Sequence, residues 1–152
     1  EVIPDELENS MAFNIYRASL LLRRELIRAL AEYDMTPEQW QVLAMLCDKP
    51  KPVKQMEIVH LSLRDKPTVS RMIKGMVRKG WLEISQDSMD KRATLVSATD
   101  EARILQKEAL EKLRNHLKPK LKTMGAEVKQ RLLADLKHLR NLLGDHPRDH
   151  DP

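Results

Sequence analysis

The fold of this chain is decided by residues 65–92, DKPTVSRMIKGMVRKGWLEISQDSMDKR. Asp65 is a side chain that commonly caps a helix, and Pro67 suits the first helical turn. Apolar residues then recur at helical spacing: Val69, Met72, Ile73, Met76 and Val77. Gly80 suits the left-handed conformation that often ends a helix. We therefore predict a helix over residues 66–79 with one apolar and one basic face.

A basic surface continues from this helix into a predicted hairpin. Residues 81–85 and 93–97 are predicted as two antiparallel strands, joined by the polar turn 87–91. Residues 64–92 hold eight Lys or Arg and four Asp or Glu, so their positive excess equals the net charge of +4 of the whole chain. Because a concentrated basic surface favours a polyanionic partner, we predict that the outer face of the helix enters a groove of DNA.

The composition limits the class of protein. With 152 residues the chain has room for one domain, or for a small domain with an oligomerising extension. Its single cysteine, Cys47, excludes an intrachain disulfide and indicates a reducing compartment. No stretch reaches the roughly 20 apolar residues that cross a bilayer, and the first residues lack the plan of a signal peptide. We therefore expect a cytoplasmic protein with no membrane partner.

Long helices are expected before the basic segment. The helix predicted over residues 4–33 carries one apolar stripe: Leu7, Met11, Ile15, Ala18, Leu22, Leu26, Ala29 and Tyr33. A small domain cannot cover a helix of this length, so we expect part of the stripe to meet a second chain. Thr36 and Pro37 mark the start of a second helix, which ends before the KPKP sequence at 49–52. A third helix is predicted over residues 54–61.

Two more helices are expected after the hairpin. Thr99 and the acids that follow predict the start of a long helix, and Pro119 is expected to bend or weaken its far end. The last helix begins near Gly125 and ends at Gly144. Its apolar stripe consists of Val128, Leu132, Leu136, Leu139 and Leu143. The remaining residues 145–152 form a polar tail that we expect to be loosely held.

The order of these elements resembles the MarR family (multiple antibiotic resistance regulators). The resemblance is carried by TPEQWQVL at 36–43, DKPTVSR at 65–71, KGWLE at 79–83, DSMDKR at 87–92 and SATDE at 97–101. It implies a mainly α fold with a small β-wing in a single chain over 1–152. Within it, a winged helix-turn-helix lobe would occupy residues 36–98, and dimerisation helices would occupy residues 1–34 and 99–144.

The resemblance also implies a function. The chain is expected to be a sequence-specific transcription regulator that binds double-stranded DNA as a homodimer on a pseudo-palindromic operator. Repression, released by a small-molecule effector, is the usual mode of the family. The helix at 66–79 would be the recognition helix in the major groove, and the wing would reach the minor groove or the backbone. The residues expected to contact DNA are Lys66, Thr68, Ser70, Arg71, Lys74, Lys91 and Arg92.

These residues divide into two groups by their chemistry. Arg71 and Ser70, with Thr68 nearby, are predicted to face base edges, because arginine is the commonest bidentate reader of guanine. The lysines are predicted to hold phosphates, which position a protein without specifying sequence: Lys66, Lys74 and Lys91. Met89 stands where the family usually has a basic residue, which leaves Arg92 as the main wing contact.

An effector site follows from the resemblance alone. Many members of the family bind small anionic aromatic molecules between the DNA-binding lobe and the dimerisation helices. Here Tyr16, Arg17 and Trp40 are the candidates to line such a site. The alternative interpretation, which we favour from the sequence, is that Tyr16 and Trp40 are ordinary core aromatics.

Other functions are weighed against DNA binding. A winged-helix module that binds only proteins remains an alternative, as does a regulator that senses oxidants through Cys47. No neighbouring residue predicts a lowered thiol pKa, however, and free cysteines are commonly buried. An enzyme is not expected, because the chain has no G-x-S-x-G elbow, P-loop or dinucleotide fingerprint. No cofactor or metal is expected either, since the histidines are scattered and His146 and His150 lie in the polar tail.

Overall fold

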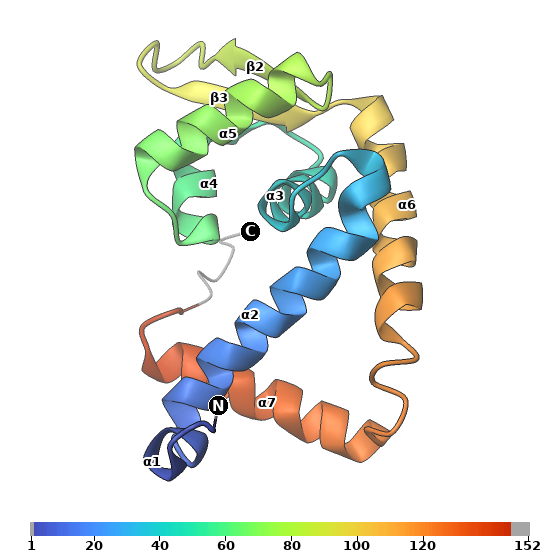
Figure 1. Cartoon of the computed structure of the whole chain (residues 1–152). Helices are drawn as coiled ribbons and strands as arrows, with labels where there is room; N and C mark the ends of the chain where they lie inside the picture. Colours follow the sequence, from blue (N-terminus) through green and yellow to red (C-terminus); the bar gives the residue numbers. More distant parts are fainter. Residues whose placement is uncertain (1, 147–152) are drawn as a thin grey trace. The chain divides into compact units, whose positions relative to one another are not determined.

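Two compact units make up the chain, one that ends at His116 and one that begins at Leu117. The computed structural model describes residues 2–146, and Figure 1 shows the order of their helices and strands. Most of these residues are helical, and the strands form one small antiparallel sheet. The predicted fold class, mainly α with a small β-wing, is confirmed. Within this described part, no helix is long and apolar enough to cross a membrane.

The first unit starts with two helices where one was predicted. α1 spans Asp5–Glu8, α2 spans Met11–Leu30, and a 3-10 turn, η1, follows at Ala31–Tyr33. The prediction of one unbroken helix is therefore wrong. Ser10 interrupts it with an extended backbone, and its hydroxyl accepts a hydrogen bond from the backbone N–H three residues later at 3.4 Å. The reason is that a serine able to cap a new helix competes with continuation of the old one.

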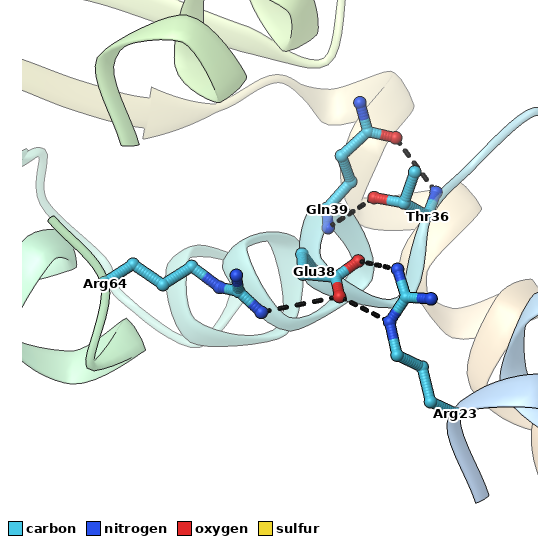
Figure 2. A network of polar contacts seen from close by, with 5 residues as sticks. All are labelled: Arg23, Thr36, Glu38, Gln39 and Arg64. Carbon is cyan, nitrogen blue, oxygen red and sulfur yellow. Dashed lines mark hydrogen bonds and ion pairs between the residues drawn. The ribbon is translucent and has the colours of Figure 1, made fainter. Parts of the chain in front are cut away.

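Three helices form the helix-turn-helix region: α3 (Pro37–Cys47), α4 (Gln55–Ser62) and α5 (Lys66–Arg78). The predicted bounds of α4 and α5 agree with these to within one residue. α3 begins with reciprocal capping between Thr36 and Gln39 (Figure 2). The Gln39 N–H donates to Thr36 Oγ1 at 3.1 Å, and the Thr36 N–H donates to Gln39 Oε1 at 3.0 Å. This capping box satisfies two backbone donors and fixes the first turn of the helix.

Two residues with positive φ define the ends of α4 and α5. Leu63 makes the turn between the two helices in the left-handed region, with φ of +55°. Gly80 has φ of +75° and turns the chain from α5 into the sheet, as its position predicts. A residue with a Cβ is disfavoured in this region, so the conformation costs more free energy at Leu63 than at Gly80.

The sheet has three strands, one more than predicted. β2 (Leu82–Gln86) and β3 (Thr94–Ala98) form the predicted hairpin, shifted by one residue along the chain. β1 (Val53–Lys54) pairs with the other edge of β3, so the strand order is β1-β3-β2 and all neighbours are antiparallel. A strand of two residues carries no alternating pattern that would predict it. Its effect is to fix the start of α4 against the base of the wing.

One hydrophobic core holds these elements together. α5 contributes Val69, Ile73 and Met76, which are buried on one face of the helix. The largest fully buried side chains of the whole core are Leu30, Leu43, Ile58, Ile73, Met76, Leu82, Val42, Val69 and Val96. They come from α2, α3, α4, α5 and the sheet, so α5 is held from one side only. The opposite face of α5 is exposed to solvent.

Two long helices follow the sheet. α6 spans Asp100–Leu117, and α7 spans Ala126–Leu142. α6 ends two residues before Pro119 instead of bending there, because the residue before a proline avoids the helical conformation. Gly144, with φ of +90°, follows the end of α7 as predicted. Of the predicted polar tail, residues 147–152 lie outside the described part of the chain.

Candidate nucleic-acid interface

The outer face of α5 is basic and exposed. Lys66, Ser70 and Lys74 follow one another at intervals of four residues, so they lie in one row along the helix. Arg71 lies beside this row, and the side chains of Lys66, Arg71 and Lys74 are all exposed, while Ser70 is half-buried. Within residues 2–146 none of these three cations forms an ion pair. Their charge therefore faces outward, opposite the apolar face that anchors the helix.

Thr68 is hydrogen-bonded to Asp65, the predicted cap of the helix. Its N–H donates to Asp65 Oδ1 and its hydroxyl donates to Asp65 Oδ2, both at 2.8 Å. These two hydrogen bonds lower the pKa of the Asp65 carboxyl below its ordinary value. Because the hydroxyl proton of Thr68 is engaged in the cap, its oxygen is left to act as an acceptor only.

The tip of the wing is held by two aspartates that bond to the backbone. Asp87 Oδ1 accepts from the N–H of Met89, and Asp90 Oδ1 accepts from the N–H of Arg92, each at 3.0 Å. These bonds fix the turn and occupy the only two carboxylates in it. The side chains of Lys91 and Arg92 are exposed, and that of Met89 is 93% exposed. The wing therefore presents two cations and one uncovered thioether to solvent.

A hollow connects the wing with the helix-turn-helix and brings two predicted DNA contacts together. Its lining residues are Lys54, Gln55, Met56, Lys66, Asp90, Arg92, Ala93 and Thr94. Lys66 and Arg92 were expected from the sequence, and Lys54 was not. Lys54 belongs to the two-residue strand β1, which no periodicity predicts, so only the paired sheet places it beside the wing. Three cations and one carboxylate around this hollow extend the basic face from α5 to the wing.

None of the three candidate effector residues lines either of the two hollows described here within residues 2–146. Tyr16 is 65% exposed, and the guanidinium of Arg17 lies over the ring of Phe13 at 5.8 Å from its centroid. Trp40 packs against the core, and its indole N–H is buried with no acceptor in the described structure. A second hollow lies near α2 and the start of α3, but it is lined by other residues: Arg23, Ile27, Ala31, Asp34, Met35, Thr36, Pro37, Gln39 and Lys79.

Neither a reactive thiol nor a metal cluster is evident in this region. Cys47 is half-buried, its Sγ lies 3.9 Å from the carbonyl of Ala102, and burial raises the pKa of its thiol above the ordinary value. A raised pKa disfavours the thiolate, which is the reactive form. Among residues 2–146 no three His, Cys, Asp or Glu side chains gather in a way that could hold a metal ion.

A comparison with known proteins shows which family part of the chain resembles. A model described as the MarR family matches residues 33–93, the segment that runs from the last residue of η1 to the residue before β3. This segment of the chain is similar to the MarR family. The predicted resemblance to this family is thereby confirmed, and the matched segment contains α4 and α5.

Two relatives show how far the likeness in sequence extends. The chain is 29% identical over 94 residues to the uncharacterized HTH-type transcriptional regulator YdcH of Bacillus subtilis, covering 60% of this chain and 64% of that protein. It is 28% identical over 101 residues to the transcriptional activatory protein BadR of Rhodopseudomonas palustris, covering 64% of this chain and 57% of BadR. The match thus spans less than two thirds of either relative. Both are transcriptional proteins, in agreement with the prediction that this chain is not an enzyme.

A solved structure extends the likeness in fold to nearly the whole chain. The transcriptional repressor CouR of Rhodococcus jostii, bound to a 23-mer DNA duplex, superimposes with a TM-score of 0.82. It is 23% identical, and the match covers 91% of this chain and 98% of CouR. The long helices outside the family-model match are therefore similar in fold to those of CouR.

Proposed function

We propose that this chain is a MarR-like, sequence-specific transcription regulator that binds double-stranded DNA as a homodimer. One observation carries the proposal: the exposed basic face of α5 stands opposite its buried apolar face and continues through a basic hollow into the wing. A cationic helix anchored on one side and flanked by a cationic hairpin suits a duplex groove. The proposal includes a location in the cytoplasm, where the chromosomal DNA lies.

In this proposal α5 enters the major groove. Arg71 and Ser70 read base edges, and Thr68, whose hydroxyl proton is held by Asp65, accepts a hydrogen bond at most. The lysines hold phosphates and set the register of the protein on the duplex: Lys66, Lys74 and Lys91. Arg92 supplies the wing contact in the minor groove or on the backbone.

A second copy of the chain is proposed because apolar side chains are left uncovered. α2 exposes Met11, Leu22 and Ile27, and α7 has no buried residue and exposes Leu132 and Leu136. Apolar stripes of this kind mark association surfaces. A twofold dimer presents two copies of α5 to two half-sites about 10 bp apart, which is why the operator is proposed to be pseudo-palindromic.

The regulatory mode is proposed to be repression released by a small anionic aromatic effector. CouR is described as a repressor, and it has also been solved with p-coumaroyl-CoA, although BadR is described as an activatory protein. In this chain the buried indole N–H of Trp40 has no acceptor in the described structure, and a ligand carboxylate or carbonyl would supply one. Tyr16 and Arg17 are proposed to approach the same ligand when it binds.

The proposal is tested by DNA binding in a salt series. We expect the purified protein to shift the DNA upstream of its own coding region, and its affinity to fall steeply as salt rises because phosphate contacts release counterions. Binding to that DNA with no preference over an unrelated duplex would contradict sequence-specific regulation. Capture of an acidic protein, with no DNA binding at any salt concentration, would favour the alternative of a protein-interaction module.

A further inference from the structure

Glu38 joins two arginines that are distant from it in the sequence (Figure 2). The Arg23 guanidinium on α2 donates from Nε to Glu38 Oε1 at 2.8 Å and from its Nη2 to Oε2 at 3.2 Å. Arg64, in the connection between α4 and α5, donates from Nη2 to Glu38 Oε1 at 3.4 Å. One carboxylate therefore links the long helix α2, the first turn of α3 and the entry to the recognition helix.

The Glu38 carboxylate is itself held in place. It lies in the first turn of α3, whose backbone is fixed by the capping box of Thr36 and Gln39. Its side chain is only 18% exposed, whereas the arginine side chains are more exposed. The hydrogen bonds from Arg23 lower the pKa of the Glu38 carboxyl, so it is charged at neutral pH. A fork-shaped guanidinium that bonds both oxygens of a fixed carboxylate restricts direction as well as distance.

The two arginines belong to the two parts whose relative direction matters for DNA binding. Arg64 immediately precedes Asp65, the residue that caps the start of α5. Arg23 lies in the middle of α2, the helix that exposes an apolar stripe for a second copy of the chain. The chain between Arg64 and α5 is too short to absorb a displacement, because the only intervening residue is the helix cap.

We propose that Glu38 is a positioning residue for operator binding: through Arg23 and Arg64 it fixes the direction of α5 relative to α2. In the dimer this direction sets the separation of the two recognition helices, and hence the half-site spacing that the protein accepts. The inference rests on the proposed function, dimeric DNA binding. Partly exposed ion pairs contribute little to folding stability, so the main effect of Glu38 is expected in the geometry of binding, with only a small effect on the stability of the fold.

The test uses operators that differ only in half-site spacing. Duplexes selected by the full-length wild-type protein from a random-sequence pool supply the operator, and one base pair is then inserted or deleted between its half-sites. Glu38→Gln keeps the size of the side chain and removes its charge. For this variant we expect affinity for the selected operator to fall about fivefold, at the lower end of measured couplings between sites. We also expect the difference in affinity between the three spacings to shrink.

A matched control separates positioning from a general loss of an ion pair. Glu32→Gln removes the carboxylate that pairs with Lys112 at 2.7 Å, which links η1 to α6 and does not touch the entry to α5. This variant is expected to keep the wild-type spacing preference. If Glu38→Gln does not fold, Arg64→Gln carries the same test, because it leaves the Arg23–Glu38 pair intact and is expected to flatten the spacing preference too.

The outcomes distinguish this inference from the proposed function. A spacing preference that is flattened in Glu38→Gln and retained in Glu32→Gln supports the positioning role. A preference that is unchanged in both Glu38→Gln and Arg64→Gln overturns it, even if affinity falls. If the wild-type protein selects no operator from the pool, that result contradicts the proposed function and therefore also this inference.

Discussion

The hydroxyl of Thr68 donates to one oxygen of the Asp65 carboxylate while the Thr68 N–H donates to the other, both at 2.8 Å. A single carboxylate thereby holds the first turn of α5, the proposed recognition helix, directly after Arg64, which Glu38 binds. The start of α5 is thus fixed twice, locally by its cap and at longer range by the ion pairs of Arg64. Changes at either point should alter DNA binding in different ways.

The cap of α5 gives the first prediction. Asp65→Ala removes both acceptors and should lower the melting temperature by about 2–4 °C, as expected for loss of an N-cap in a chain of this size. Asp65→Asn retains a capping oxygen and should melt close to wild type. Thermal unfolding followed by circular dichroism measures both variants. Equal melting temperatures for Asp65→Ala and wild type would show that the cap contributes nothing to stability.

The turn between α4 and α5 gives a second prediction. Leu63 has φ of +55° and a side chain that is 79% exposed, so it gains little from packing and occupies a disfavoured conformation. Leu63→Gly should therefore raise the free energy of unfolding by about 0.5–1 kcal/mol. The matched control Leu61→Gly, inside α4, should lower it by about 1 kcal/mol. Urea denaturation at equilibrium compares them, and a loss of stability in both variants would contradict the argument.

Much of the recognition region could be predicted because its signals are local. The cap at Asp65, the apolar spacing of α5 and the stop at Gly80 lie within 16 consecutive residues, and each acts on the backbone beside it. The break at Ser10 was missed since an unbroken apolar stripe outweighed one capping residue. The spacing of apolar residues indicates which side of a helix is apolar. It does not indicate whether the helical backbone is continuous.

The contacts that extend the candidate site could not be predicted in the same way. Lys54 joins the basic hollow only because β1 pairs with β3. Glu38 meets Arg23 and Arg64 across 15 and 26 residues of sequence. Such encounters depend on how helices pack, and no pattern in one sequence specifies them. The exposure of Arg71 and Lys74, by contrast, follows directly from their place opposite the apolar face.

The ion pair of Glu38 gives a third prediction, on pH dependence. Hydrogen bonds from Arg23 lower the pKa of the Glu38 carboxyl below its ordinary value of 4.5. A carboxyl with a lowered folded-state pKa contributes stability above its unfolded-state pKa, and the contribution is lost as pH falls through the folded-state pKa. Wild type should therefore lose more stability than Glu38→Gln between about pH 6 and about pH 3. Urea titrations across this range measure the difference, and parallel pH curves would rule out the contribution.

The division of α5 into base and phosphate contacts gives a fourth prediction. Arg71→Ala should cost about 1–3 kcal/mol of binding free energy at one operator position and relax the preference there. Lys74→Ala should weaken binding to all duplexes alike. It should also reduce the slope of log affinity against log salt concentration by about the amount that one phosphate contact contributes. Fluorescence anisotropy with single-base operator variants separates the two patterns. Lys122→Ala, in the connection between α6 and α7, is the control, and a uniform loss in Arg71→Ala would reassign Arg71 to a phosphate.

The uncovered stripe of α7 gives the last prediction. Leu132 is 45% exposed in the single chain, and a second copy would bury it. Leu132→Glu places a charge in that interface, where an unpaired carboxylate is costly, so the dimer should dissociate at micromolar concentration. Arg131→Glu changes the neighbouring exposed position, off the stripe, and should leave the dimer intact. Sedimentation equilibrium measures the mass of each variant. A monomer has only one copy of α5 and can bind only one half-site, so the operator affinity of Leu132→Glu should fall as its dimer fraction falls. An unchanged mass would place the interface elsewhere.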